Sequence, residues 1–233
     1  MKAQKYQHLF FDLDRTLWDF DGNSRITLRE IFENRDLQQK LGTDFDGFIR
    51  FYKPYNLQLW DQYKQGQIEK AYLSVERFAG SLRHFGLDDV DLATKISKDY
   101  LTISPTKTKL FPDALEVLET LKADYQMHII TNGFNEVQFV KLENSGLMPF
   151  FKNIITSEMI GVQKPKPEIF SYAMAQSDAN KEESLMIGDD QDSDIIGAQN
   201  AGMDQVFVDF HHDPLKANPT YHIHQLKDLL NIL

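Results

Sequence analysis

Short apolar runs alternate with helical patterns along most of this chain of 233 residues. Five runs have the length and composition of buried strands, and segments such as 112–122 and 165–175 carry apolar side chains on one helical face. This alternation predicts an α/β fold with a doubly wound, Rossmann-like parallel sheet of five strands. The expected strands are His8–Phe11, Met127–Ile130, Asn153–Thr156, Ser184–Ile187 and Gln205–Asp209.

The alternation is interrupted by residues 18–110, which repeat apolar and aromatic side chains at spacings of three and four. Such stripes indicate packed helices, so we expect a mainly helical domain inserted into an α/β core of residues 1–17 and 111–233. Pro54 removes one helical hydrogen bond and predicts a kink or break in the first of these helices. The stripes lie at 45–63, 68–82 and 92–103.

Polar residues follow the predicted strands directly. Asp12 and Asp14 come after the first strand, where a carboxylate pair is costly unless it shares a cation or a proton. Because the carboxyl ends of parallel strands meet at one edge of a sheet, the polar residues after the other strands are expected to join this pair. They are Thr131, Asn132 and Gly133, the segment Gly188-Asp189-Asp190, Asp194, and Lys164 before Pro165.

Together these side chains predict a site for phosphate and a hard cation. Carboxylate oxygens suit Mg²⁺, which readily shares its coordination shell with a phosphate. The hydroxyl of Thr131, the amide of Asn132 and the backbone of Gly133 can donate hydrogen bonds to phosphate oxygens, and Lys164 adds a positive charge. A carboxylate beside a metal ion and a lysine stays ionised and can attack phosphorus.

Composition and charge narrow the class of partner. The formal net charge of -10 argues against nucleic-acid polymers and membrane surfaces, which are polyanionic. The absence of cysteine excludes disulfides and thiolate ligands. No apolar signal segment or run of about 18 apolar residues is present, so we expect a cytoplasmic protein. The expected partner is a small-molecule phosphomonoester, and the choice between monomer and homodimer stays open.

The polar motifs resemble those of the haloacid dehalogenase (HAD) superfamily. The four matching motifs are 12–16, Thr131, Lys164 and 188–194, in that order and over essentially the whole chain. The resemblance implies that Asp12 is a nucleophile that forms an aspartyl-phosphate. It also implies that Asp14 protonates the leaving oxygen and then activates water.

The same resemblance implies the remaining roles. Lys164 and Thr131 would hold the phosphoryl group. Asp12, the backbone carbonyl of Asp14, and Asp189 would bind Mg²⁺, with Asp194 in support. The role of Asp190 stays open. Haloacid dehalogenases attack carbon and lack a residue equivalent to Asp14, so the chain resembles the phosphatases of the superfamily, and its insertion resembles their C1 type of helical cap.

A narrower resemblance is to pyrimidine 5'-nucleotidases of the YjjG type, which act on pyrimidine nucleoside monophosphates. It rests on the cap segments 56–60, 63–68 and 77–78, and on 130–134 and His211-His212 in the core. Arg15 departs from the pattern, which more often has a small or acidic residue there. In the cap, Trp60, Tyr63 and the loop at Gly66 are candidates for contact with a base, because aromatic surface stacks on flat rings.

Alternatives remain at this stage. The chain could be a general phosphatase for sugar phosphates or phosphoglycolate, and less plausible choices are a haloacid dehalogenase and a non-catalytic or receiver-like phosphate-binding module. The aromatic stripes also fit a bundle core. For His211-His212 no third metal ligand can be named from the sequence, which favours ordinary loop residues.

Overall fold

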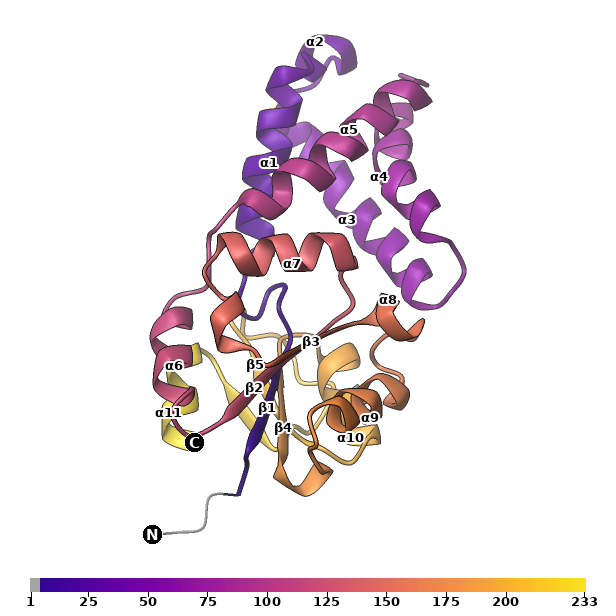
Figure 1. Ribbon diagram of the computed structural model, residues 1–233. Helices are drawn as coiled ribbons and strands as arrows, with labels where there is room; N and C mark the ends of the chain where they lie inside the picture. The colour runs from indigo at the N-terminus through magenta and orange to yellow at the C-terminus, as the bar shows by residue number, and fades with distance from the viewer. Residues whose placement is uncertain (1–4) are drawn as a thin grey trace. The chain divides into compact units, whose positions relative to one another are not determined.

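The structure is a computed structural model that describes residues 5–233. The chain forms two compact units: an α/β unit made of the residues up to Asp21 together with Thr108–Leu233, and a helical unit, Gly22–Lys107 (Figure 1). Within residues 5–233, no helix has both the length and the apolar character that crossing a bilayer requires.

The sheet of the α/β unit has six parallel strands in the order β3-β2-β1-β4-β5-β6. The expectation of five strands was wrong by one, because the sixth strand has only three residues, at the edge of the sheet, and one of them is exposed. Such a strand lacks the apolar run that marks a buried one. The strands are β1 (His8–Phe11), β2 (Gln126–Thr131), β3 (Asn153–Thr156), β4 (Ser184–Gly188), β5 (Asp204–Val208) and β6 (Tyr221–Ile223).

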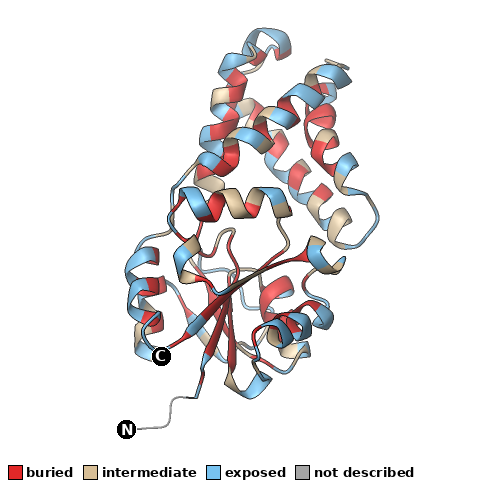
Figure 2. Ribbon diagram, in the orientation of Figure 1, coloured by how far each residue is buried: buried red, intermediate tan, exposed pale blue. Residues whose placement is uncertain are grey.

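Helices cover both faces of this sheet. Alternate residues of β1 point to opposite faces: Leu9 and Phe11 join a core cluster with α6 and α11, whereas Phe10 joins another with α9 and α10 (Figures 1 and 2). Both faces are therefore dry, which explains why the central strands are continuously apolar. The helices of this unit are α6 (Ala114–Leu121), α7 (Asn135–Asn144), α8 (Ser157–Ile160), α9 (Pro167–Gln176), α10 (Gly197–Asn200) and α11 (Leu229–Ile232), with a π-helical turn at Gln191–Ile196.

The two linkers of the insertion are bonded to each other inside the α/β unit. Trp18 and Leu110 form an antiparallel bridge. The N–H of Asp19 donates to the carbonyl of Lys109 at 3.0 Å, and the N–H of Phe111 donates to the carbonyl of Leu17 at 2.9 Å. The chain therefore leaves and re-enters this unit at one place.

The helical unit has an aromatic core. Phe48 and Tyr52 of α3 stack on each other, and Tyr52 stacks on Phe78 of α4. The expected break at Pro54 does not occur, and α3 runs through it. Pro54 and Arg50 are both exposed, so water can satisfy the carbonyl that the proline leaves unbonded. The helices are α1 (Phe20–Asn34), α2 (Leu37–Leu41), α3 (Phe45–Lys64), α4 (Lys70–His84) and α5 (Val90–Ile103).

Candidate active site

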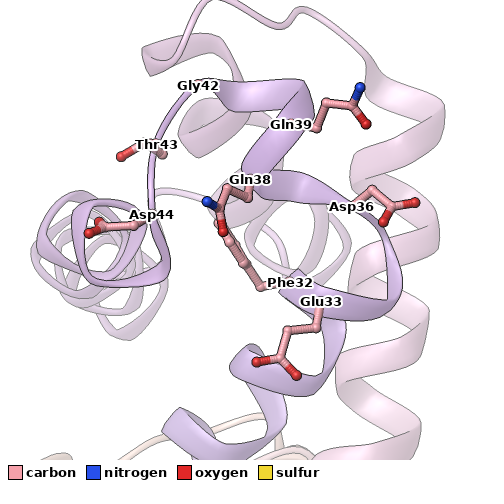
Figure 3. A pocket seen from close by; sticks show the side chains of 8 residues that line it. All are labelled: Phe32, Glu33, Asp36, Gln38, Gln39, Gly42, Thr43 and Asp44. Atoms are coloured by element: carbon pink, nitrogen blue, oxygen red, sulfur yellow. The ribbon is translucent and has the colours of Figure 1, made fainter.

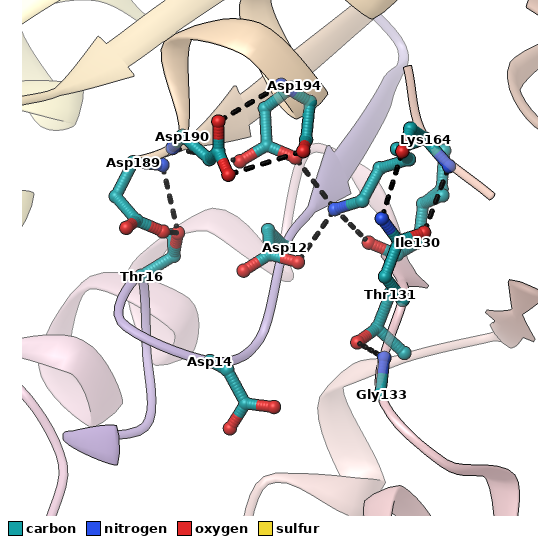
Figure 4. A network of polar contacts seen from close by, with 12 residues as sticks. Asp12, Asp14, Thr16, Ile130, Thr131, Gly133, Lys164, Asp189, Asp190 and Asp194 are labelled. Carbon is teal, nitrogen blue, oxygen red and sulfur yellow. Dashed lines mark hydrogen bonds and ion pairs between the residues drawn. The ribbon is translucent and has the colours of Figure 1, made fainter. Parts of the chain in front are cut away.

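A buried lysine lies between two buried carboxylates at the carboxyl end of the sheet. Lys164 Nζ lies 2.6 Å from Asp12 Oδ1 and 2.6 Å from Asp194 Oδ1, and it donates to the carbonyl of Ile130 at 2.8 Å (Figure 4). The side chains of Lys164 and Asp194 are 2% and 1% exposed. A charge this deep is tolerated only when it is paired and hydrogen-bonded, so these three groups depend on one another.

Asp189, after β4, adds a third carboxylate to this cluster. Thr16 Oγ1 donates to Asp189 Oδ1 at 2.9 Å, and the N–H of Asp189 donates back to Thr16 Oγ1 at 3.1 Å. One oxygen from each of Asp12, Asp189 and Asp194 lies within 4.8 Å of the others. The sequence motif therefore folds into a compact oxygen donor set, which we call the carboxylate cluster.

Burial dominates the electrostatics of the carboxylate cluster. It raises the pKa of Asp12 to about 7; Lys164 opposes this shift, and the neighbouring Asp194 and Asp14 add to it. Burial also raises the pKa of Asp189 and of Asp194. The protein's own groups therefore do not keep Asp12 fully ionised at neutral pH. A divalent cation would offset the mutual repulsion, so this all-oxygen donor set fits Mg²⁺.

Asp14 turns away from the carboxylate cluster and contacts α7. Lys141 Nζ lies 2.6 and 2.8 Å from its two carboxylate oxygens, and Gln138 Nε2 donates to Oδ2 at 2.9 Å. Lys141 is 4% exposed at its side chain and lies 4.4 Å from the centre of the Trp18 ring. Burial lowers the pKa of Lys141, and the Asp14 carboxylate opposes that shift. Asp14 is thus held by a cation that the sequence analysis did not identify.

Gln138 also reaches Thr131, the expected phosphate ligand. Thr131 Oγ1 accepts hydrogen bonds from Gln138 Nε2 at 2.6 Å and from the N–H of Gly133 at 3.1 Å. A hydroxyl has two acceptor sites and one proton, so the proton of Thr131 is left to donate to another oxygen. A side chain at Gly133 would meet Gln138, which explains why glycine stands there.

Asn132 has a different contact from the one expected. Its Oδ1 accepts from the N–H of Lys164 at 2.8 Å, and its Nδ2 donates to the carbonyl of Lys164 at 2.9 Å. Both ends of the amide are thus engaged with the backbone of Lys164. Asn132 therefore positions Lys164 in this structure, and its direct contact with phosphate stays a prediction.

Two further motif residues also have identifiable contacts. Asp190 Oδ1 accepts from the N–H groups of Asp192 and Ser193, both at 3.0 Å, so it caps the π-helical turn that carries Asp194. Arg15 donates to Asp21 at 3.2 Å, and its guanidinium lies 4.5 Å from the centre of the Phe20 ring.

The cap candidates can be described only within the helical unit. Trp60 and Tyr63 are half-buried and form an edge-on pair with ring centres 5.7 Å apart, so they stand outside the fully buried core of Phe48 and Tyr52. Gly66 has a φ of 70°, which favours glycine in the turn after α3. The pocket in Figure 3 is lined by the end of α1, by α2 and by the start of α3, and it includes none of the three.

Comparison with known proteins places this site in a family. Residues 9–208 match the model of the haloacid dehalogenase-like hydrolases. The pyrimidine 5'-nucleotidase PynA of Streptococcus pneumoniae is 32% identical, with 98% of this chain and 95% of PynA covered. The pyrimidine 5'-nucleotidase YjjG of Escherichia coli is 31% identical, with 98% of each chain covered. The Bacillus subtilis protein YfnB, in a crystal structure bound to magnesium, superposes with a TM-score of 0.90 at 30% identity, covering 98% of this chain and 99% of that one.

The chain belongs to the haloacid dehalogenase-like hydrolases. It is an enzyme of that class, and the resemblance noted from its four motifs is confirmed.

Proposed function

We propose that this protein is a Mg²⁺-dependent phosphomonoester hydrolase that works through an aspartyl-phosphate on Asp12. The observation that carries the proposal is the buried lysine, Lys164, bonded to Asp12 and Asp194 beside the third carboxylate of Asp189. Such a site combines a nucleophile, a positive charge for phosphate and an oxygen donor set for a hard cation.

In the first step, a carboxylate oxygen of Asp12 attacks phosphorus. The bond between phosphorus and the ester oxygen breaks, and that oxygen leaves with the electron pair and takes a proton from the Asp14 carboxyl group. Lys164 and the free hydroxyl proton of Thr131 stabilise the phosphoryl oxygens. Gln138 and Lys141 keep the Asp14 carboxyl group in place.

In the second step, Asp14 takes a proton from water. The water oxygen attacks the phosphorus of the aspartyl-phosphate, the bond to Asp12 breaks, and inorganic phosphate leaves. Asp12 and Asp189, with the backbone carbonyl of Asp14 and with Asp194 in support, would hold Mg²⁺. Bound there, the ion supplies positive charge that neutralises the phosphoryl oxygens and the carboxylates.

The substrate that we propose is a pyrimidine nucleoside 5'-monophosphate. Similarity over nearly full length to PynA and YjjG supports this choice. The half-buried pair of Trp60 and Tyr63 also supports it, because aromatic rings outside the core leave surface for a flat base. The cap role of the helical unit and the cytoplasmic location belong to the same proposal.

Phosphate release from a panel of esters tests this function. UMP, dUMP and dTMP should give the highest kcat/KM with Mg²⁺, ahead of hexose phosphates and phosphoglycolate, and EDTA should abolish turnover. A sugar phosphate or phosphoglycolate that exceeds every pyrimidine monophosphate tenfold would leave the general phosphatase and remove the nucleotidase. Failure to hydrolyse even p-nitrophenyl phosphate would remove both.

A further inference from the structure

Two histidines and one aspartate converge at the far side of the same sheet. The parallel register pairs Phe207 of β5 with His222 of β6, and the N–H of Asp209 donates to the carbonyl of Ile223 at 2.8 Å. Alternate residues of a strand share a face. Phe207 and Asp209 therefore lie on the same face as His222 and His224, and the ring of His222 stacks on Phe207.

The distances among these side chains suit a single small ion. His222 Nε2 lies 3.0 Å from Asp209 Oδ2, and His224 Nδ1 lies 3.8 Å from the same oxygen. All three candidate ligand atoms lie within 4.8 Å of one another. Ligands about 2.1 Å from a tetrahedral ion stand roughly 3.4 Å apart, so only small side-chain adjustments are needed.

Burial and charge differ usefully among the three groups. The side chain of Asp209 is 2% exposed, and its Oδ1 accepts from the N–H of Asp213 at 2.9 Å. Burial raises the pKa of this carboxyl, but hydrogen bonds from that N–H and from His222 lower it further, so it stays ionised. The side chains of His222 and His224 are 29% and 47% exposed, which gives an ion access from solvent.

The loop after β5 adds another imidazole. The ring of His212 packs against that of His224, with centres 4.3 Å apart. The sequence motif His211-His212 lacked a third partner along the chain. The fold supplies partners from β6 and the residue after it, which stand more than nine residues further on.

We propose that Asp209, His222 and His224 form a second metal site, selective for a borderline transition-metal ion of the Zn²⁺ class. Two imidazole nitrogens and one carboxylate oxygen favour such ions over Mg²⁺, which prefers oxygen. A bound ion would tie the loop that begins at Asp209 to β6. The site takes no part in the proposed hydrolysis.

Titration calorimetry of the full chain with ZnCl₂ in saturating Mg²⁺ tests the proposal. The parent protein should bind one more Zn²⁺ ion than the double variant His222→Ala/His224→Ala, whatever zinc enters the carboxylate cluster. Each single variant should weaken this binding at least ~10-fold. Titration with Co²⁺ should show visible absorption bands of nitrogen ligation that the double variant lacks.

His211→Ala is the matched control, because it removes an imidazole from the same loop and leaves the backbone unchanged. It should bind Zn²⁺ like the parent. All these variants should keep the Mg²⁺-dependent activity, which also reports that they fold. The proposal is overturned if the double variant binds as many Zn²⁺ ions with the parent's affinity, or if His211→Ala loses as much affinity as His224→Ala. Loss of phosphatase function would not produce either result.

Discussion

The carboxylate cluster and the histidine site lie at the ends of strands in one sheet, yet they differ in almost every chemical respect. Asp12, Asp189 and Asp194 offer only oxygen, are largely buried and have raised pKa values. At Asp209 two imidazoles replace two carboxylates, and hydrogen bonds lower the pKa of the remaining carboxyl. The strand ends bring polar groups together in both places, whereas burial and ligand type decide which ion each place can hold.

The largest effect is expected from Asp12→Asn. The amide removes a nucleophile and a ligand of the carboxylate cluster at once, so kcat should fall by at least ~10³-fold for every ester. His222→Ala/His224→Ala should leave turnover within about twofold of the parent. Phosphate-release assays on proteins with matched circular dichroism spectra measure both. Activity of Asp12→Asn within tenfold of the parent would assign the nucleophile wrongly.

A smaller loss is expected from Lys141→Met. Methionine fills the buried volume, but it removes the two contacts that fix the Asp14 carboxylate. We expect kcat/KM to fall ~10- to 100-fold for nucleotides and less for p-nitrophenyl phosphate, whose leaving group needs no acid. A purely structural role would lower both equally. Lys141→Arg should recover part of the loss, and the exposed Lys152→Met serves as control.

The support of Asp189 by Thr16 is expected to matter for metal affinity. Thr16→Val keeps the shape of the side chain but removes the hydroxyl that donates to Asp189 and accepts from its N–H. The Mg²⁺ concentration for half-maximal activity should rise ~10-fold, as is usual for partners of a metal ligand. Zn²⁺ binding at the histidine site should not change, so titrations with both ions separate the two sites. An unchanged Mg²⁺ requirement would show that Thr16 is dispensable.

The smallest effect concerns pH and stability. The folded-state pKa of Asp12, about 7, exceeds its ordinary value of 3.8. The stabilisation from the protonated group is therefore complete below about pH 4 and is lost as the pH rises through about 7. In EDTA, Tm should fall between pH 5 and 8, and Mg²⁺ should raise Tm more at pH 8 than at pH 5. Differential scanning fluorimetry checks this, and Asp12→Asn should flatten the fall.

Much of the α/β unit could be predicted because a buried strand leaves a legible apolar run. His8–Phe11 and Asn153–Thr156 are strands at the expected residues. The edge strand β6 could not be predicted in this way, since its three residues include exposed His222. Pro54 misled for a similar reason, because the proline rule does not include the packing that stabilises α3 on either side of it.

The catalytic motifs could be identified because strand ends determine where their side chains meet. Lys141 and Gln138 could not, since a lysine on an amphipathic helix is ordinarily exposed and nothing local marks it as buried. One signal was present: the two residues stand three positions apart, on one face of the helix after Thr131. The histidine site was also out of reach, because its ligands meet only through the pairing of β5 with β6.

The bridge between Trp18 and Leu110 has a consequence for how such a protein can diversify. Because the ends of the intervening segment are already joined within the α/β unit, the entropy of closing that long loop is offset by hydrogen bonds that do not involve the segment itself. A different insert between the same two linkers would leave the register of β1 and β2 untouched. Evolution can therefore exchange the whole segment 22–107 while the carboxylate cluster is inherited unchanged.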